Sequence, residues 1–454
     1  MIQQGDALDL EITTLTAGGD GLGHYGEGEK RRAIFVADSV PGDQLRVRIT
    51  EAKKIVRGKI IEVVRPSAHR VRPPCIVADK CGGCQWQAVA YATQLAQKKQ
   101  MVIDSLERIG GLEHPPVAEV LGADDPLHYR NKSTFPVGSS QQGNIMAGYY
   151  RKQSHDLINL NQCPVQDIKL NPILEKTKAL IQAMGWSTYN EKTQVGYIRH
   201  LGLRVGRRTD KVLLTLVTTE LNLPNLEKFC TAIHQQFRSV VSICLNLNNQ
   251  PTNAIFGPQT KVVTGKGFIQ EQFCGLEFQI GPTTFFQVNT EQAERMIYTL
   301  LDLAQFTKED KVVDAYSGIG TLSLPIAQQV KKVIAIESFA PSVQQAQLNA
   351  QNNRIGNVAF LAGTVEDQLA EVLQPDHTLV LDPPRKGCDP SVLDVILKKQ
   401  PQRVFYLSCN PSTLARDLKH LSTQYEVKTV IPIDFFPQTY HVEALSYLER
   451  KVLS

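Results

Sequence analysis

Residues 311–324 read KVVDAYSGIGTLSL and decide the fold of the chain. An apolar strand runs into a turn with Gly318 and Gly320, which let a ligand approach the backbone closely, and then into the start of a helix. A second apolar strand, KVIAIE at residues 332–337, ends in Glu337. Its carboxylate follows the turn by about 20 residues, where an acid can bind both hydroxyls of a ribose.

This turn has two other interpretations. A dinucleotide-binding fold has the same layout, and a strand–turn–helix unit can also be purely structural. The spacing here is Asp-x-x-x-Gly-x-Gly, beginning at Asp314, and not Gly-x-Gly-x-x-Gly. An acid before the turn and a missing third glycine favour a nucleoside that carries a sulfonium, such as S-adenosylmethionine (SAM), over the pyrophosphate of NAD.

From Phe285 onward helices and strands alternate, which predicts a parallel sheet covered by helices. Residues 378–387, TLVLDPPRKG, form a strand that ends in Asp382, and the prolines after it fix a loop at the carboxyl edge of the sheet. Amine methyltransferases that act on nucleic acids place an aromatic residue after the two prolines. Arg385 stands there in this chain and argues against amine methylation.

A third strand delivers a cysteine to the same edge. In residues 403–417, RVFYLSCNPSTLARD, Cys409 lies just before a helix that begins with proline, and a helix N-terminus stabilises a thiolate. A single cysteine after a strand is more often core packing. The edge that also carries Asp382 and Gly318 favours a nucleophile instead. Glu443, near the C-terminus, is then a candidate base.

The first 65 residues predict a small barrel. Short alternating strands are separated by tight turns, including the glycine loop at residues 18–23, as in barrels of the OB type that bind oligonucleotides. Basic residues exceed acids between Arg46 and Arg72, which indicates either a solvated surface or an RNA-binding face. Gln85 to Arg108 shows the apolar spacing of an amphipathic helix that ends at Gly110-Gly111.

Four of the nine cysteines are candidate metal ligands. Cys75, Cys81 and Cys84 lie close together, and Cys163 follows much later and precedes a proline. Zinc sites usually use two close pairs, whereas a distant ligand followed by proline is typical of iron–sulfur proteins. Spacing alone leaves a cluster, zinc and packing open. The cysteines without partners are expected to be core or incidental residues, namely Cys230, Cys244, Cys274 and Cys388.

Together these motifs resemble the uracil-5 RNA methyltransferase family, in the branch with an N-terminal TRAM domain and an iron–sulfur cluster. The motifs that carry the resemblance span the chain in order: the N-terminal glycine-rich barrel, Cys75-x5-Cys81-x2-Cys84, Tyr129-Arg130-Asn131-Lys132, Phe285-Phe286-Gln287-Val288-Asn289, Asp314 to Gly320, Asp382 to Arg385, Ser408-Cys409-Asn410-Pro411 and Thr439 to Glu443.

The resemblance implies a role for each matching residue. By this resemblance, SAM is contacted by Gln287, Tyr316, Glu337 and Asp382. Cys409 becomes the nucleophile that adds to C6 of uridine, and Glu443 the base that removes the C5 proton. A [4Fe–4S] cluster is implied at Cys75, Cys81, Cys84 and Cys163, with a role in structure or RNA docking. Some family members have Asn where this chain has Thr321, so the role of that residue stays open.

The expected architecture is a multi-domain α/β protein. It comprises an OB-like TRAM barrel at residues 1–65, a central α+β domain with the cluster at 66–284, and a Rossmann-like SAM-dependent methyltransferase domain at 285–454. The expected product is 5-methyluridine in RNA, with 23S rRNA as the favoured substrate and the transfer-RNA T-loop as the alternative. Two alternative functions belong to other classes of protein. One is a non-catalytic RNA-binding or ribosome-assembly protein, and the other is a flavin- or NAD-dependent RNA-modifying oxidoreductase.

Composition indicates a soluble cytoplasmic protein with reduced thiols. The 454 residues are 42% hydrophobic and 21% charged, and the net charge is only +4, so an RNA surface must be a local patch. No apolar run reaches the roughly 20 residues of a membrane span, and the acidic N-terminus is not a signal peptide. No obligate protein partner is indicated. Basic side chains predicted to contact RNA in the central region are Arg130, Lys132, Arg199, His200 and Arg204.

Overall fold

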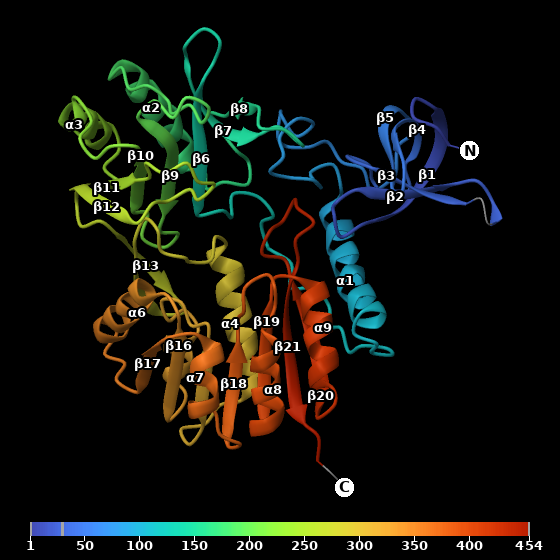
Figure 1. The fold of residues 1–454 in the computed structure, drawn as a ribbon, viewed down its shortest axis with the longest axis vertical. Helices are drawn as coiled ribbons and strands as arrows, with labels where there is room; N and C mark the ends of the chain where they lie inside the picture. The colour runs from blue at the N-terminus through green and yellow to red at the C-terminus, as the bar shows by residue number, and fades with distance from the viewer. Residues whose placement is uncertain (1, 29–30, 453–454) are drawn as a thin grey trace.

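The computed structural model describes residues 2–28 and 31–452. Three packed bodies are visible in Figure 1: a barrel at the N-terminus, a central sheet, and a sheet at the C-terminus that is flanked by helices. Among the residues described, no helix is long and apolar enough to cross a membrane.

The first five strands close into a barrel in the order β1-β2-β3-β5-β4, with β4 pairing back onto β1. Alternate apolar residues such as Ile12 and Val47 point inward and are fully buried. This closed barrel is consistent with the OB-like domain expected from the sequence. The strands are β1 Ala7–Leu15, β2 Gly21–Tyr25, β3 Arg32–Val36, β4 Gln44–Ala52 and β5 Val56–Arg65.

Helix α1, Tyr91–Arg108, begins later than predicted. We expected a helix from Gln85, but residues 85–90 form a loop. The N–H groups of Gln85 and Trp86 donate to the carbonyl oxygen of Gln438 at 3.2 and 3.0 Å. The indole of Trp86 is fully buried. These long-range contacts override the helical periodicity of the segment, as tertiary packing often does.

The central body is a seven-stranded sheet in the order β12-β11-β10-β9-β6-β7-β8. Strands β10 and β11 pair in parallel, and the other strand pairs described in this sheet are antiparallel. Helices α2 and α3 bury their apolar faces on it. The elements are β6 Lys132–Ser139, β7 Ile145–Tyr150, β8 Leu157–Asn159, α2 Leu170–Ala183, β9 Ile198–Val205, β10 Val212–Thr218, α3 Leu226–Gln236, β11 Val240–Leu247 and β12 Gln259–Thr264.

The C-terminal body is a seven-stranded sheet in the order β17-β16-β15-β18-β19-β21-β20. Strands β15 to β19 run parallel, and β21 is antiparallel to both β19 and β20. This confirms the alternating α/β pattern predicted after Phe285. The elements are α4 Thr290–Ala304, β15 Lys311–Ala315, α5 Ser323–Ala327, β16 Lys332–Glu337, α6 Ala340–Asn352, β17 Val358–Ala362, α7 Val365–Val372, β18 His377–Leu381, α8 Pro390–Lys399, β19 Arg403–Ser408, α9 Pro411–Leu421, β20 Tyr425–Ile433 and β21 Glu443–Arg450.

Two elements from the middle of the chain pack on the C-terminal sheet. The hairpin of β13, Ile269–Phe273, and β14, Leu276–Ile280, shares a core with α4 and α5. Helix α1 lies against α9 and buries Val102 and Leu106 in the other core of the sheet (Figure 1). The domain boundaries at residues 65 and 284 remain a prediction, and this packing favours grouping α1 and the hairpin with the C-terminal body.

Candidate active site

The predicted site residues of the C-terminal body lie along one edge of its sheet. Glu337 ends β16, Tyr316 follows β15, Asp382 follows β18, Cys409 follows β19 and Glu443 begins β21. Because these strands are neighbours in that order, the side chains succeed one another across the edge. Neighbouring strands lie about 4.8 Å apart, so β16 and β19 are about 14 Å apart. An elongated ligand can therefore contact several of them at once.

The glycine turn is shaped for a ligand next to Glu337. Tyr316, Gly318 and Gly320 all have positive φ angles, of 70°, 57° and 88°, and a Cβ added to Gly318 would meet open space. The N–H of Gly318 donates to Oε2 of Glu337 at 2.9 Å, and the N–H of Phe339 donates to Oε1 at 2.7 Å. These bonds fix the carboxylate beside the turn, as recognition of a ribose requires.

Two aspartates face the middle of the edge. Asp314 is fully buried and accepts a hydrogen bond from the hydroxyl of Ser323, but its Oδ1 and the hydroxyl of Ser317 have no protein partner among the described residues. Burial raises the pKa of Asp314 to about 7, and burial also raises the pKa of Asp382 to about 7. Unpartnered buried polar atoms and carboxyls held at a high pKa suit a site that awaits a polar, positively charged ligand.

Gln287 lies in the loop between β14 and α4. Asn131, just before β6, holds this loop: its N–H donates to the carbonyl of Val288 at 2.8 Å, and its Nδ2 donates to the carbonyl of Gln287 at 2.9 Å. The Tyr129–Lys132 motif thus supports the Phe285–Asn289 motif. This explains why the two motifs belong together although they are far apart in sequence.

Cys409 and Glu443 are brought together by strand register. Strands β19 and β21 pair Ser408 with Ala444, so the next position along each strand places Cys409 opposite Glu443. Both side chains are only partly exposed. Burial raises the pKa of the Cys409 thiol, and Glu443 and Asp382 raise it further. Burial and the charge of Asp382 raise the pKa of Glu443 to about 8. The predicted nucleophile and the predicted base therefore lie opposite each other at the sheet edge.

A pocket of about 230 Å³ opens beside Cys409. Among the described residues that line this pocket, Arg385 is the only lysine or arginine. The Nη2 atom of Arg385 lies 3.1 Å from Nδ1 of His441. Burial and the charge of Arg385 lower the pKa of His441 to about 4, so the ring is neutral at pH 7 and accepts this hydrogen bond. The positive charge of Arg385 lowers the pKa of both Cys409 and Glu443, and so partly offsets the rise that the neighbouring carboxyl groups cause.

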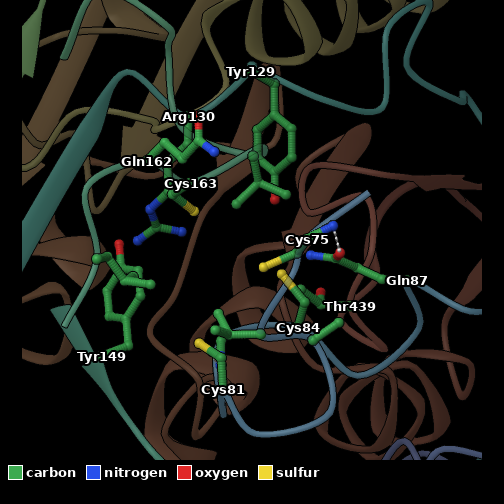
Figure 2. A pocket seen from close by; sticks show the side chains of 15 residues that line it. Cys75, Cys81, Cys84, Gln87, Tyr129, Arg130, Tyr149, Gln162, Cys163 and Thr439 are labelled. Carbon is green, nitrogen blue, oxygen red and sulfur yellow. Dashed lines mark hydrogen bonds between the residues drawn. The ribbon is translucent and has the colours of Figure 1, made fainter. Parts of the chain in front are cut away.

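The four predicted metal ligands line a single cavity of about 180 Å³ between the residue 75–87 segment and the central sheet (Figure 2). Cys81, Cys84 and Cys163 are buried. Burial raises the pKa of Cys84 to about 12, and the neighbouring thiols contribute to the rise. The N–H of Cys75 donates to Oε1 of Gln87 at 3.1 Å, which anchors the first ligand of the set (Figure 2).

These sulfurs surround the cavity without converging on one point. Within residues 2–28 and 31–452, no three His, Cys, Asp or Glu side chains are grouped closely enough to hold a metal ion. A zinc ion needs its sulfur ligands about 2.3 Å from one centre. The remaining cysteines behave as expected: Cys230, Cys244, Cys274 and Cys388 are buried in hydrophobic cores.

One loop, residues 434–442, borders both the cysteine cavity and the Cys409 pocket. Thr439 lines the cavity, whereas Tyr440, His441 and Val442 line the pocket. The loop rises from the sheet edge toward the other two bodies (Figure 1, between β20 and β21). At its base Asp434 forms a fully buried ion pair with Lys98 of α1, with 2.5 Å between Nζ and Oδ1.

Residues 90–451 match the family model described as tRNA (uracil-5-)-methyltransferase. The match covers most of the chain and includes the whole sheet edge just described. The chain belongs to this family. It is an enzyme, an RNA (uracil-5-)-methyltransferase, which confirms the family and the activity expected from the motifs.

Relatives of the methyltransferase extend over its full length. An uncharacterized RNA methyltransferase of Thermosynechococcus vestitus is 49% identical and covers 98% of each chain. A second, from Synechocystis, is 46% identical and covers 98% of this chain and 96% of the relative. The structure resembles that of the Pyrococcus abyssi tRNA (uracil-54, C5)-methyltransferase in complex with S-adenosyl-L-homocysteine, with a TM-score of 0.77 and 26% identity over 97% of this chain and 100% of that chain.

Some predicted RNA contacts in the central body are wrong for a physical reason. Arg199 is buried, donates to the carbonyl oxygens of Asn248, Gln250 and Thr252, and so holds a loop. Arg204 is buried as well and donates to the carbonyl of Thr284. Sequence gives charge but not burial, so surface and interior cations looked alike.

Sequence reasoning also missed contributions to the site. The sequence analysis used Arg385 as part of the Asp382 to Arg385 motif and as evidence against amine methylation, and it included His441 only within the Thr439 to Glu443 motif. Their pairing depends on a contact between the β18–α8 loop and the residue 434–442 loop, which no local pattern reveals. The same holds for the Lys98–Asp434 pair, because a lysine on an amphipathic helix ordinarily faces solvent.

Proposed function

We propose that this methyltransferase methylates C5 of a uridine in RNA through a covalent bond between Cys409 and C6. The observation that carries the proposal is the placement of Cys409 opposite Glu443, at the end of the edge whose other end carries Glu337. The carboxylate proposed to bind the nucleoside and the proposed nucleophile–base pair thus lie toward the two ends of one sheet edge.

The reaction follows from the chemistry of the pair. C5 of uracil is a weak nucleophile. Addition of the Cys409 thiolate to C6 forms an S–C6 bond and moves electron density onto C5, which then takes a methyl group. Glu443, as carboxylate, removes the C5 proton, and the returning electrons expel the thiolate. The product is 5-methyluridine, and Cys409 is regenerated.

SAM is the methyl donor that the fold and family favour, and the described residues fit it. Glu337 suits the ribose, and the open space over Gly318 suits close approach of the nucleoside. We propose that Gln287, Tyr316 and Asp382 contact SAM as well, as the family resemblance implies. When bound, SAM supplies a methyl group on a positively charged sulfur, and a carboxylate at Asp382 favours that charge.

The RNA substrate is a finer proposal. We infer 23S rRNA, as the resemblance to the TRAM-containing branch indicates. The Pyrococcus enzyme acts on tRNA at uracil 54, and this observation favours the tRNA T-loop as the second candidate.

A transfer assay separates the two substrates. Methyl-labelled SAM is supplied with 23S rRNA fragments or with tRNA transcripts, and 5-methyluridine is mapped by nuclease digestion and mass spectrometry. The proposal expects label at uridine C5 of the rRNA. Label only in tRNA would select the second candidate, and no label in either RNA would contradict the proposed function.

For the cysteine cavity we propose a [4Fe–4S] cluster held by Cys75, Cys81, Cys84 and Cys163. A cluster brings its own iron and sulfide atoms, so its four thiolates surround a cavity rather than meet at one ion. Four cysteines around one cavity support this assignment. Among the described residues, no Asp, Glu or His side chain lines the cavity. Bound there, the cluster would tie the residue 75–87 segment to the residue 160–165 segment.

A further inference from the structure

The pocket beside Cys409 has a wall from the N-terminal barrel. Besides residues of the sheet edge, Ala17 lines it, together with Met101 and Ser105 of α1. Ala17 belongs to the turn between β1 and β2, residues 16–20. The barrel therefore reaches the reacting cysteine, although it lies more than three hundred residues earlier in the sequence.

This turn has a closed geometry that only glycine permits. The N–H of Thr16 donates to the carbonyl of Asp20 at 2.8 Å, and the N–H of Gly19 donates to the carbonyl of Thr16 at 2.9 Å. Gly19 has a φ of 90°. A Cβ added there would lie 2.7 Å from Cδ1 of Tyr440 and 3.3 Å from Gln85. The turn thus contacts the residue 434–442 loop at van der Waals distance.

Further contacts fix the turn to the rest of the molecule. The carbonyl of Gly19 accepts a hydrogen bond from Nε1 of Trp86 at 3.0 Å. Trp86 is fully buried in a hydrophobic cluster with Leu15 and Val40 of the barrel, and Tyr440 packs against this cluster. A buried indole with its N–H satisfied is a stiff anchor, so the turn and Tyr440 keep one relative position.

From Tyr440 the contacts continue to the reacting groups. The rings of Tyr440 and His441 have centroids 4.3 Å apart, and His441 accepts the hydrogen bond from Arg385. A shift of Tyr440 would therefore move His441 and the guanidinium of Arg385, which lines the same pocket as Cys409.

We propose that the residue 16–20 turn of the barrel forms a wall of the pocket for the target nucleotide and positions Tyr440 and His441 for the reaction. This inference rests on the proposed function, because it takes Cys409 as the nucleophile. The barrel would then act in selecting and placing the base that reacts, in addition to any binding of RNA outside the site.

A matched pair of glycine variants tests the positioning role. Gly19→Ala introduces a Cβ against Tyr440, whereas Gly5→Ala introduces one at a similar φ of 97° with nothing within 4 Å. Both positions have a similar positive φ, so the two variants differ mainly in the contact of the new Cβ with Tyr440 and Gln85. We expect Gly19→Ala to lower kcat/KM for RNA on the order of 100-fold relative to Gly5→Ala, as a displacement near 1 Å in an active site does. The Kd for SAM should be equal in the two variants.

A second pair tests the wall and does not depend on a stable Gly19 variant. Ala17→Trp fills the mouth of the pocket, and Ala7→Trp places the same side chain on an exposed position of β1. Alkylation of Cys409 by iodoacetamide, followed by peptide mass spectrometry without RNA, should slow about tenfold in Ala17→Trp only, since the bulk restricts access.

Equal alkylation and equal methylation in Ala17→Trp and Ala7→Trp would overturn the inference, as would equal kcat/KM in the two glycine variants. Failure of the proposed function looks different. In that case the wild type forms no 5-methyluridine, while the difference in alkylation between the tryptophan variants is still observed.

Discussion

Nη2 of Arg385 lies 3.1 Å from Nδ1 of His441, and both side chains line the pocket of Cys409. Because His441 is neutral, it directs the guanidinium without adding a charge of its own. Arg385 then opposes Asp382 and Glu443, the two carboxyl groups that disfavour a thiolate at Cys409. Arg385 thus favours the thiolate form of Cys409, the proposed nucleophile.

The first prediction concerns this arginine. Arg385→Gln should move the pH midpoint for alkylation of Cys409 upward by about one pH unit, because the thiolate loses its nearby positive charge. Arg385→Lys should keep part of the effect. The midpoint is measured by iodoacetamide labelling between pH 7 and 10, with the Cys409 peptide quantified by mass spectrometry.

Lys386→Gln is the control for this experiment, since it removes the adjacent exposed cation from the same loop. We expect its midpoint to match the wild type. An unchanged midpoint in Arg385→Gln would show that the guanidinium does not act on the thiol.

The second prediction uses the high pKa of Glu443. Its pKa of about 8 in the folded protein lies above the ordinary value near 4.3 of an unfolded chain. The folded state therefore binds this proton more tightly, and stability falls as pH rises from about 4.5 to about 8. Glutamine does not titrate. The Tm of Glu443→Gln should exceed that of the wild type by about 2–4 °C at pH 8.5 and by less at pH 5. An equal difference at both pH values would rule out the raised pKa.

The third prediction concerns the cysteine cavity. Protein purified without oxygen should hold about four irons per chain and absorb in the visible range, and Cys81→Ser should lose the iron. Cys230→Ser, which changes a buried cysteine outside the cavity, should retain it. Metal analysis and absorbance report the result without an activity assay. Stoichiometric zinc in place of iron would contradict the cluster.

The fourth prediction concerns the base of the residue 434–442 loop. Lys98 and Asp434 are both fully buried, so Lys98→Met removes the positive partner of a buried carboxylate, which keeps the hydrogen bond from Tyr91, and should cost about 3–5 kcal/mol of stability. The double variant Lys98→Met/Asp434→Leu should cost clearly less, because both charges are gone. Urea unfolding compares the wild type, Lys98→Met, Asp434→Leu and the double variant. A double variant as unstable as the sum of the single changes would show that the pair is not coupled.

Several parts of the structure were predictable because local sequence determines them. The strand–turn–helix at residues 311–324 and the strand that ends at Ser408 follow from apolar runs bounded by glycine and proline. At the sheet edge, Glu337, Asp382 and Cys409 could be brought together from sequence because parallel strands place their carboxyl ends on one side.

Other parts depend on contacts between distant segments. The late start of α1 follows from the bonds of Gln85 and Trp86 to Gln438, and the burial of Arg199 follows from a loop after β11. Gly19 belongs to the loop predicted as an ordinary glycine turn, since nothing near it in sequence indicates that Tyr440 will lie against it. Side-chain periodicity carries no information on which loops meet.

The most direct test of the account traps the bond between protein and RNA. In Glu443→Gln the amide has the volume of the acid but cannot accept the C5 proton, so addition and methyl transfer proceed while release of the thiolate stalls. With SAM and substrate RNA, this variant should give a methylated RNA–protein adduct that survives denaturing electrophoresis, with Cys409 as the attached residue. RNA containing 5-fluorouridine should trap the wild type in the same way. The double variant Cys409→Ala/Glu443→Gln should form no adduct, and Cys409→Ala alone should bind SAM but not methylate. An adduct that forms without Cys409, or normal turnover by Glu443→Gln, would contradict the central claim.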